Sequence, residues 1–146
     1  MKKVWLLSLT VVPVLAWSGD NVDAGCAKVG ASMYIDLTNA VVRDQHIDAA
    51  LLQDKHVTVD VLEITPVSEV FAEQMAATDV ASQTGTRLRK EDFFESYYTN
   101  GAKSITAKYT FINAKGQRDV FIASSLLNND ECSVRFNGYL TLSREF

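Results

Sequence analysis

"SITAKYTFINAKGQRDVFIASSLLNNDECSVRFNGYLTLS", residues 104–143, contains three runs of β-type sequence separated by two turns. The first run alternates apolar and polar positions, and its apolar positions are Ile105, Ala107, Tyr109 and Phe111. Alternation with a period of two is typical of a strand that buries one face. The tetrapeptides "NAKG" (113–116) and "NNDE" (128–131) are rich in turn-forming residues. The stretch therefore predicts an antiparallel meander of three strands.

The third run, "CSVRFNGYLTLS" (132–143), contains a break in its alternation. The positions expected to point inward are Val134, Phe136, Tyr139 and Leu142. The spacing of these positions changes from two residues to three between Phe136 and Tyr139. Asn137 and Gly138 lie in this interval and indicate a bulge or a local kink.

A fourth strand is predicted upstream, in "KHVTVDVLEIT" (55–65). Valines alternate with polar residues at Val57, Val59 and Val61, and the pattern then moves by one position to Leu62 and Ile64. A bulge or the end of the strand accounts for that shift. Pro66 then marks a turn or a sheet edge.

Helices are predicted in the remaining segments. Residues 27–42 repeat apolar side chains at steps of three and four, at Val29, Met33, Leu37, Ala40 and Val41, and the helix is expected to continue or restart through "HIDAALLQD" (46–54). "SEVFAEQMAA" (68–77) fits a short helix, although the choice between helix and strand for residues 67–76 stays open. "TDVASQTGTR" (78–87) is expected to be a loop, because it is polar and contains Gly85.

An aromatic helix is predicted in "KEDFFESYYTNG" (90–101), where Phe93, Phe94, Tyr97 and Tyr98 have helical spacing and Asn100-Gly101 supplies a stop. The aromatic side chains are expected in the core, with a ligand-stacking surface as the alternative. Together these elements predict an α+β fold with about four antiparallel strands covered by two or three helices. The fold is expected to be one domain, residues 25–146.

The N-terminus has the layout of a secretory signal peptide. Lys2 and Lys3 precede an uncharged apolar run, residues 4–17, which is shorter than the roughly 20 residues that span a bilayer. We therefore expect no stable membrane anchor and a periplasmic location. Small residues at the −3 and −1 positions allow cleavage after Ala24 or after Ser18, and the sequence leaves this choice open.

Cys26 and Cys132 are the two cysteines of the chain. An oxidising compartment favours a disulfide between them, with one available connectivity. Two alternatives remain open, a lipid on Cys26 and a pair of buried free thiols. The lipid alternative is weakened by Asp23, which stands where a lipoprotein signal has an apolar residue.

Charge and motif content narrow the function. The formal net charge is −4, and the basic cluster at residues 87–90 is followed at once by Glu91 and Asp92, so a nucleic-acid partner is not expected. The sequence lacks a Gly-x-Ser-x-Gly turn and a phosphate-binding glycine loop. His46 and His56 lack the spacing of a zinc site. We therefore expect no catalytic residues, metal or cofactor, and a binding protein rather than an enzyme.

The layout resembles that of the periplasmic immunity proteins of type VI secretion systems. The resemblance rests on "MKKVWLLSLTVVPVLA", the cysteine pair, the helix after "DAGC", and the C-terminal meander that ends in "CSVRFNGYLTLSREF". It implies a protein that neutralises a cognate muramidase-like effector by occluding its active-site cleft, and it allows a homodimer. No family motif transfers inhibitory residues to this sequence.

Two surface segments are candidates for partner contact. The first is the turn Asn128, Asn129, Asp130 and Glu131, whose amides and acids would project from a scaffold fixed by Cys132. The second is Glu69, Phe71 and Glu73, which could present an aromatic ring surrounded by acids. Two other classes stay open: a small-ligand or envelope-stress binding module, and a small secreted hydrolase.

Overall fold

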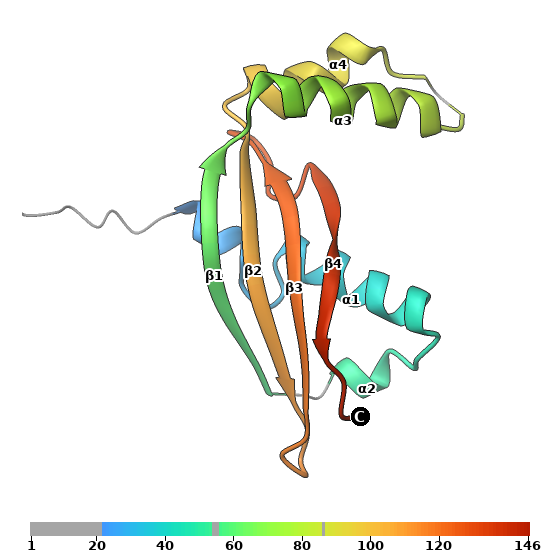
Figure 1. Cartoon of the computed structure of the whole chain (residues 1–146), viewed down its shortest axis with the longest axis vertical. Helices are drawn as coiled ribbons and strands as arrows, with labels where there is room; N and C mark the ends of the chain where they lie inside the picture. Colours follow the sequence, from blue (N-terminus) through green and yellow to red (C-terminus); the bar gives the residue numbers. More distant parts are fainter. Residues whose placement is uncertain (1–21, 54–55, 86) are drawn as a thin grey trace, which may run out of the picture.

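The computed structural model describes residues 22–53, 56–85 and 87–146. Its centre is an antiparallel sheet with the strand order β1-β2-β3-β4 (Figure 1). The strands are β1 (His56–Pro66), β2 (Lys103–Ile112), β3 (Arg118–Leu127) and β4 (Arg135–Ser143). The predicted α+β class, the C-terminal meander and the fourth strand are confirmed.

Bulges interrupt the sheet where the apolar alternation changes. The register of β1 against β2 shifts between Val61 and Glu63, so Leu62 is the extra residue. A second shift, between β3 and β4, lies at Asn137, and both sites were predicted. A third shift makes Leu142 an extra residue, which is 56% exposed. The expectation that Leu142 points inward is wrong, because the bulge moves it out of the inward register.

The main core lies between one face of the sheet and the N-terminal helices. These helices are η1 (Val22–Ala27), α1 (Ser32–Gln45) and α2 (Ala50–Gln53). The fully buried aromatic residues of the sheet are Tyr109, Phe111 and Phe121, and α1 contributes Met33, Leu37 and Val41. The Tyr109 hydroxyl donates a hydrogen bond of 2.8 Å to the carbonyl of Ala27, which fixes η1 to β2.

The first long helix begins later than the sequence predicted. Gly30 adopts a φ of +85° in the turn that separates η1, which ends at Ala27, from α1. Val29, which was assigned to the buried stripe, is 53% exposed. His46 ends α1 in a left-handed conformation, and α2 restarts within "HIDAALLQD" as expected.

The helix α3 (Glu69–Ser82) lies across one end of the sheet (Figure 1). The choice between helix and strand for residues 67–76 is thus decided in favour of a helix that begins at Glu69. Ser68 is its N-cap, and the Ser68 hydroxyl accepts a hydrogen bond from the amide of Phe71 at 3.3 Å. The prediction of a loop at residues 78–87 is wrong for residues 78–82, which continue the helix. The small side chains Ala72 and Ala76 are fully buried, which allows close packing against the aromatic segment.

The aromatic segment forms α4 (Lys90–Phe94) followed by a π-helical turn, η2 (Glu95–Thr99). The helix stop at Asn100-Gly101 is confirmed, since Gly101 has a φ of +65°. Tyr97 is buried in a second apolar cluster with Val67, Ala72, Ala76, Ala102 and Leu126. Core packing therefore accounts for Tyr97, whereas Tyr98 is exposed.

The disulfide predicted between Cys26 and Cys132 is present, with the two Cα atoms 5.2 Å apart. It joins η1 to the segment between β3 and β4. Within the described ranges, no helix is long and apolar enough to cross a bilayer. The predicted signal peptide lies almost wholly in residues 1–21, outside the described residues.

Candidate partner-binding site

Residues 128–133 form most of the connection between β3 and β4 and lie at the end of the sheet that carries α3 and α4 (Figure 1). They include the predicted contact residues Asn128, Asn129, Asp130 and Glu131, followed by Cys132 and Ser133. We call this segment the β3-β4 loop.

Asn128 closes the turn of the β3-β4 loop from inside. Its Oδ1 accepts hydrogen bonds from the amides of Asp130 and Glu131 at 3.0 and 2.9 Å, and its own amide donates to the carbonyl of Glu131 at 3.0 Å. Its Nδ2 donates to the carbonyl of Ser96 in η2 at 3.2 Å. Asn128 therefore shapes the loop, and its side chain is not available to a partner.

The end of the aromatic segment supports the loop from one side. The amide of Asn129 donates to the carbonyl of Asn100 at 3.2 Å, and Nδ2 of Asn100 donates to Oδ2 of Asp130 at 2.7 Å. A Cβ atom at Gly101 would lie 2.8 Å from Nδ2 of Asn129, closer than such contacts occur. The absence of a side chain at Gly101 thus allows Asn129 to approach.

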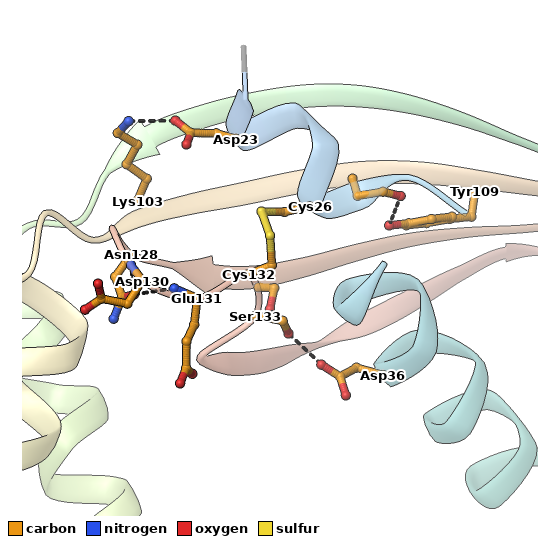
Figure 2. The surroundings of a disulfide bond; sticks show 12 residues. Asp23, Cys26, Asp36, Lys103, Tyr109, Asn128, Asp130, Glu131, Cys132 and Ser133 are labelled. Carbon is orange, nitrogen blue, oxygen red and sulfur yellow. Dashed lines mark hydrogen bonds and ion pairs between the residues drawn. A yellow bond between two sulfur atoms is a disulfide. The ribbon is translucent and has the colours of Figure 1, made fainter. Parts of the chain in front are cut away.

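The C-terminal end of the loop is held by the disulfide and by Ser133 (Figure 2). Ser133 has a φ of +59°, which is uncommon outside glycine. Its hydroxyl donates to Oδ2 of Asp36 on α1 at 2.5 Å and lies 2.6 Å from the hydroxyl of the buried Ser125. The loop is thus fixed to η1, α1, η2 and β3.

The outer side of the loop presents three exposed side chains, Asn129, Asp130 and Glu131. In Figure 2 the Glu131 side chain extends away from the turn, on the side opposite the strand β2. Clefts of about 300 Å³ and about 270 Å³ adjoin the loop, and Asp130 and Glu131 line both of them. The loop therefore forms a ridge between two grooves.

Carboxylates surround this ridge, and two of them, Asp92 and Asp23, have cationic partners. The groove beside α4 contains Asp92 in addition to the two loop acids. The hydrogen bond from Arg89 lowers the pKa of Asp92 below its ordinary value, so this carboxylate stays ionised. On the other side of the loop, Asp23 pairs with Lys103 at 2.6 Å. The exposed carboxylates can accept hydrogen bonds from donors of a partner.

The second predicted patch is not assembled as expected. Glu69 is exposed in the first turn of α3, but Phe71 is half-buried and packs against the second apolar cluster. Glu73 forms an ion pair with Lys90 of α4. The exposed apolar residue of this turn is Val70, at 79%. Phe71 lies four residues after Val67 and four before Met75, which contact the same cluster, so it shares their side of the chain and is not an exposed anchor.

The cleft around Phe94 was not predicted from the sequence. Phe94 and Thr99 line a space of about 260 Å³ together with Glu73, Lys90, Glu91 and Glu95. Phe94 belongs to the aromatic pattern that was recognised in the sequence. The other residues that line this cleft come from α3, α4 and η2. The supporting roles of Ser96, Asn100, Gly101 and Asp36 were also missed, because they act on a loop that is distant in sequence.

The two histidines and the buried Asp119 lie outside the β3-β4 loop. His46 and His56 are exposed at opposite ends of the connection into β1. In the part of the chain that the structure describes, no group of three or more His, Cys, Asp or Glu residues is arranged to hold a metal ion. The buried carboxylate of Asp119 accepts from the amides of Glu145 and Phe146 at 2.7 and 3.2 Å.

Comparison with protein-family models, with curated proteins and with solved structures found no match to this chain.

Proposed function

We propose that the protein is a periplasmic immunity protein that binds a cognate secreted peptidoglycan hydrolase and inhibits it by occluding the active-site cleft. The observation that supports this proposal is the β3-β4 loop, a projecting ridge of amide and acid side chains that four other elements hold in place.

The chemistry of the loop suits the cleft of a glycan hydrolase. Such a cleft holds a polysaccharide and contains a carboxylic acid that is protonated at neutral pH. The exposed carboxylate of Glu131 can accept a hydrogen bond from that acid, and Asn129 can donate and accept in place of sugar hydroxyls. Occupation of the cleft inhibits by competition, so the inhibitor itself needs no catalytic group.

The rigidity of the loop favours tight binding. Immobilising a flexible side chain on association costs about 0.5 to 1.5 kcal/mol. Hydrogen bonds of Asn128, Asp130 and Ser133 already order the loop, so this cost on association falls chiefly on the exposed side chains of Asn129 and Glu131.

The test begins with capture of partners from the periplasm of the producing cell on the oxidised protein. The captured protein is then assayed for the degradation of purified peptidoglycan while the chain is titrated into the reaction. We expect complete inhibition at a one-to-one ratio. A captured protein without cell-wall hydrolase activity, or a hydrolase that remains active at saturation, would contradict the proposal.

Glu131→Ala should weaken the inhibition at least tenfold, equivalent to about 1.4 kcal/mol, because it removes an exposed acceptor that has no hydrogen-bond partner among the described residues. Glu63→Ala is the matched control, since it removes the same charge from the exposed bulge of β1. Equal inhibition by both variants would argue against the β3-β4 loop as the contact surface.

A second candidate function is a small-ligand binding module, which the cleft that contains Phe94 favours. Native mass spectrometry of the protein isolated from periplasm would then detect a bound molecule, and Phe94→Ala would lose it. Recovery of the protein without any adduct would count against this function.

A further inference from the structure

We propose that the precursor is cleaved between Ser18 and Gly19, so that residues 22–24 remain in the mature domain. This inference depends on export of the chain and not on the inhibitory function. Of the two candidate bonds, Ser18-Gly19 precedes the described fold, whereas Ala24-Gly25 lies inside η1.

The residues on the N-terminal side of Ala24-Gly25 take part in the fold. Asp23 forms an ion pair with Lys103 of β2, at 2.6 Å between Oδ2 and Nζ, and its side chain is 24% exposed. Val22 and Asp23 also line the cleft that contains Cys26 and the β3-β4 loop. Cleavage after Ala24 would remove half of η1 and leave Lys103 without this carboxylate.

Cleavage at that bond would also reverse a charge. The new α-amino group on Gly25 would be largely protonated at neutral pH and would lie one residue before Cys26. Lys103 lines the same cleft as Cys26, so the lysine would lose its carboxylate and a new cation would form one residue away from the lining residue Cys26. Opposite charges at close range stabilise a fold, and like charges destabilise it.

The sequence around Ser18 is compatible with cleavage. The apolar run, residues 4–17, ends directly before Ser18, with Ala16 and Ser18 at the −3 and −1 positions. Six residues that include Asp20 and Asp23 separate Ser18 from the other bond. The Ser18-Gly19 bond is therefore both the bond whose cleavage preserves the fold and the bond that lies next to the apolar run.

Intact mass spectrometry of the full chain expressed with its own signal and recovered from the periplasm tests the inference. The expected species is residues 19–146 with both cysteines oxidised. A species that begins at Gly25, an uncleaved precursor, or a chain acylated on Cys26 would overturn the proposal.

Two variants provide a matched comparison, because a bulky residue at −1 prevents cleavage. Ser18→Tyr should lose the species 19–146, whereas Ala24→Tyr should be processed at the same position as the parent protein. The mass is measured on denatured protein, so the result does not depend on whether Ala24→Tyr folds stably. The opposite pattern would place cleavage after Ala24.

The contribution of residues 22–24 to the stability of the mature domain can be measured directly. Chains that begin at Gly19 and at Gly25, each exported behind a signal with a defined cleavage site, are compared by thermal denaturation. The shorter chain should melt about 3 °C or more below the longer chain, as expected for the loss of part of η1 and of the ion pair. Equal melting temperatures would show that residues 22–24 do not belong to the mature fold.

Discussion

The Asp79 carboxylate joins three elements at the end of the sheet. It accepts a hydrogen bond from the Tyr97 hydroxyl at 2.8 Å, and Nε and Nη2 of Arg135 donate to its two oxygens at 2.7 and 3.2 Å. These contacts connect α3, η2 and β4. Burial raises the pKa of Asp79, but the hydrogen bonds from Arg135 and Tyr97 and the charge of Arg135 outweigh burial, and the pKa is lowered.

This lowered pKa predicts a specific loss of stability in acid. Because the pKa of Asp79 is lower in the folded state, its carboxylate stabilises the fold at pH values above the unfolded-state pKa, about 3.9. The stabilisation is lost as the pH falls through the folded-state pKa. Asp79→Asn should lower the free energy of unfolding at pH 7 by on the order of 2 kcal/mol.

Urea denaturation between pH 7 and pH 2 measures this effect. The difference in unfolding free energy between the native protein and Asp79→Asn should shrink below about pH 4. A difference that stays constant down to pH 2 would show that the charge on Asp79 is not the stabilising feature.

Asp119 anchors the C-terminus through a fully buried carboxylate. One oxygen accepts from the amides of Glu145 and Phe146, and the other lies 3.0 Å from Nε of Arg144, an ion-pair distance without hydrogen-bond alignment. Asp119→Asn should cost about 2 to 3 kcal/mol, because a buried charged acceptor loses its charge.

The matched control for Asp119→Asn is Asp60→Asn. Asp60 pairs with Lys108 at 3.1 Å on the exposed side of the sheet, and exposed ion pairs contribute at most about 1 kcal/mol. Thermal denaturation should therefore separate the two variants clearly. Similar melting temperatures would argue against Asp119 as an anchor.

At the scale of elements, the end of η2 and the β3-β4 loop form one unit through Gly101. Gly101→Ala should destabilise the protein for two reasons: its φ of +65° disfavours a side chain, and the new methyl group would overlap Asn129. Gly116→Ala shares only the first reason, since Gly116 has a φ of +78° and open space around it. Because the overlapping atoms belong to the exposed side chain of Asn129, which can move aside, we expect Gly101→Ala to cost more than Gly116→Ala by at most about 0.5 kcal/mol.

A double variant separates the two contributions to the effect of Gly101→Ala. In Gly101→Ala/Asn129→Ala the overlap is removed, so the stability should recover to that expected from backbone strain alone, as measured by chemical denaturation. Additive losses in the double variant would show that Asn129 does not pack on Gly101.

The strands could be predicted from the sequence because each has a local pattern. Alternation identified the buried face of β2, and the changes of phase located the bulges at Leu62 and Asn137. Helix boundaries were less predictable. Gly30 was expected to weaken one continuous helix, whereas its positive φ separates η1 from α1.

Contacts between distant segments account for the remaining errors. The polar residues after Ala77 were assigned to a loop, but α3 continues there, where Asp79 meets Arg135 from β4. The turn 128–131 was identified as a projecting candidate, yet its supports, Ser96 and Asn100, lie about 30 residues away in the sequence. No local pattern encodes a pairing of this kind.

At the scale of the whole molecule, the disulfide closes a sequence separation of 106 residues. Closing a loop of about 100 residues is worth at most about 4.7 kcal/mol in chain entropy, against a typical domain stability of about 5 to 15 kcal/mol. Cys132→Ser should therefore lower the melting temperature by several degrees under oxidising conditions. Differential scanning calorimetry with and without reductant measures the change, and Cys26→Ser/Cys132→Ser should show no response to reductant. Equal melting temperatures of the native protein in both conditions would contradict this role.

The position of the disulfide also determines how the chain would respond to mechanical tension. A force applied between the N-terminal residues and the C-terminus passes through the sulfur bridge, so along the covalent chain it loads the residues before Cys26 and the 14 residues from Ser133 to Phe146, and it bypasses residues 27–131. Peeling off β4 would release roughly 50 Å of chain at about 3.5 Å per residue. The first three strands would bear no load until the bridge itself was cut.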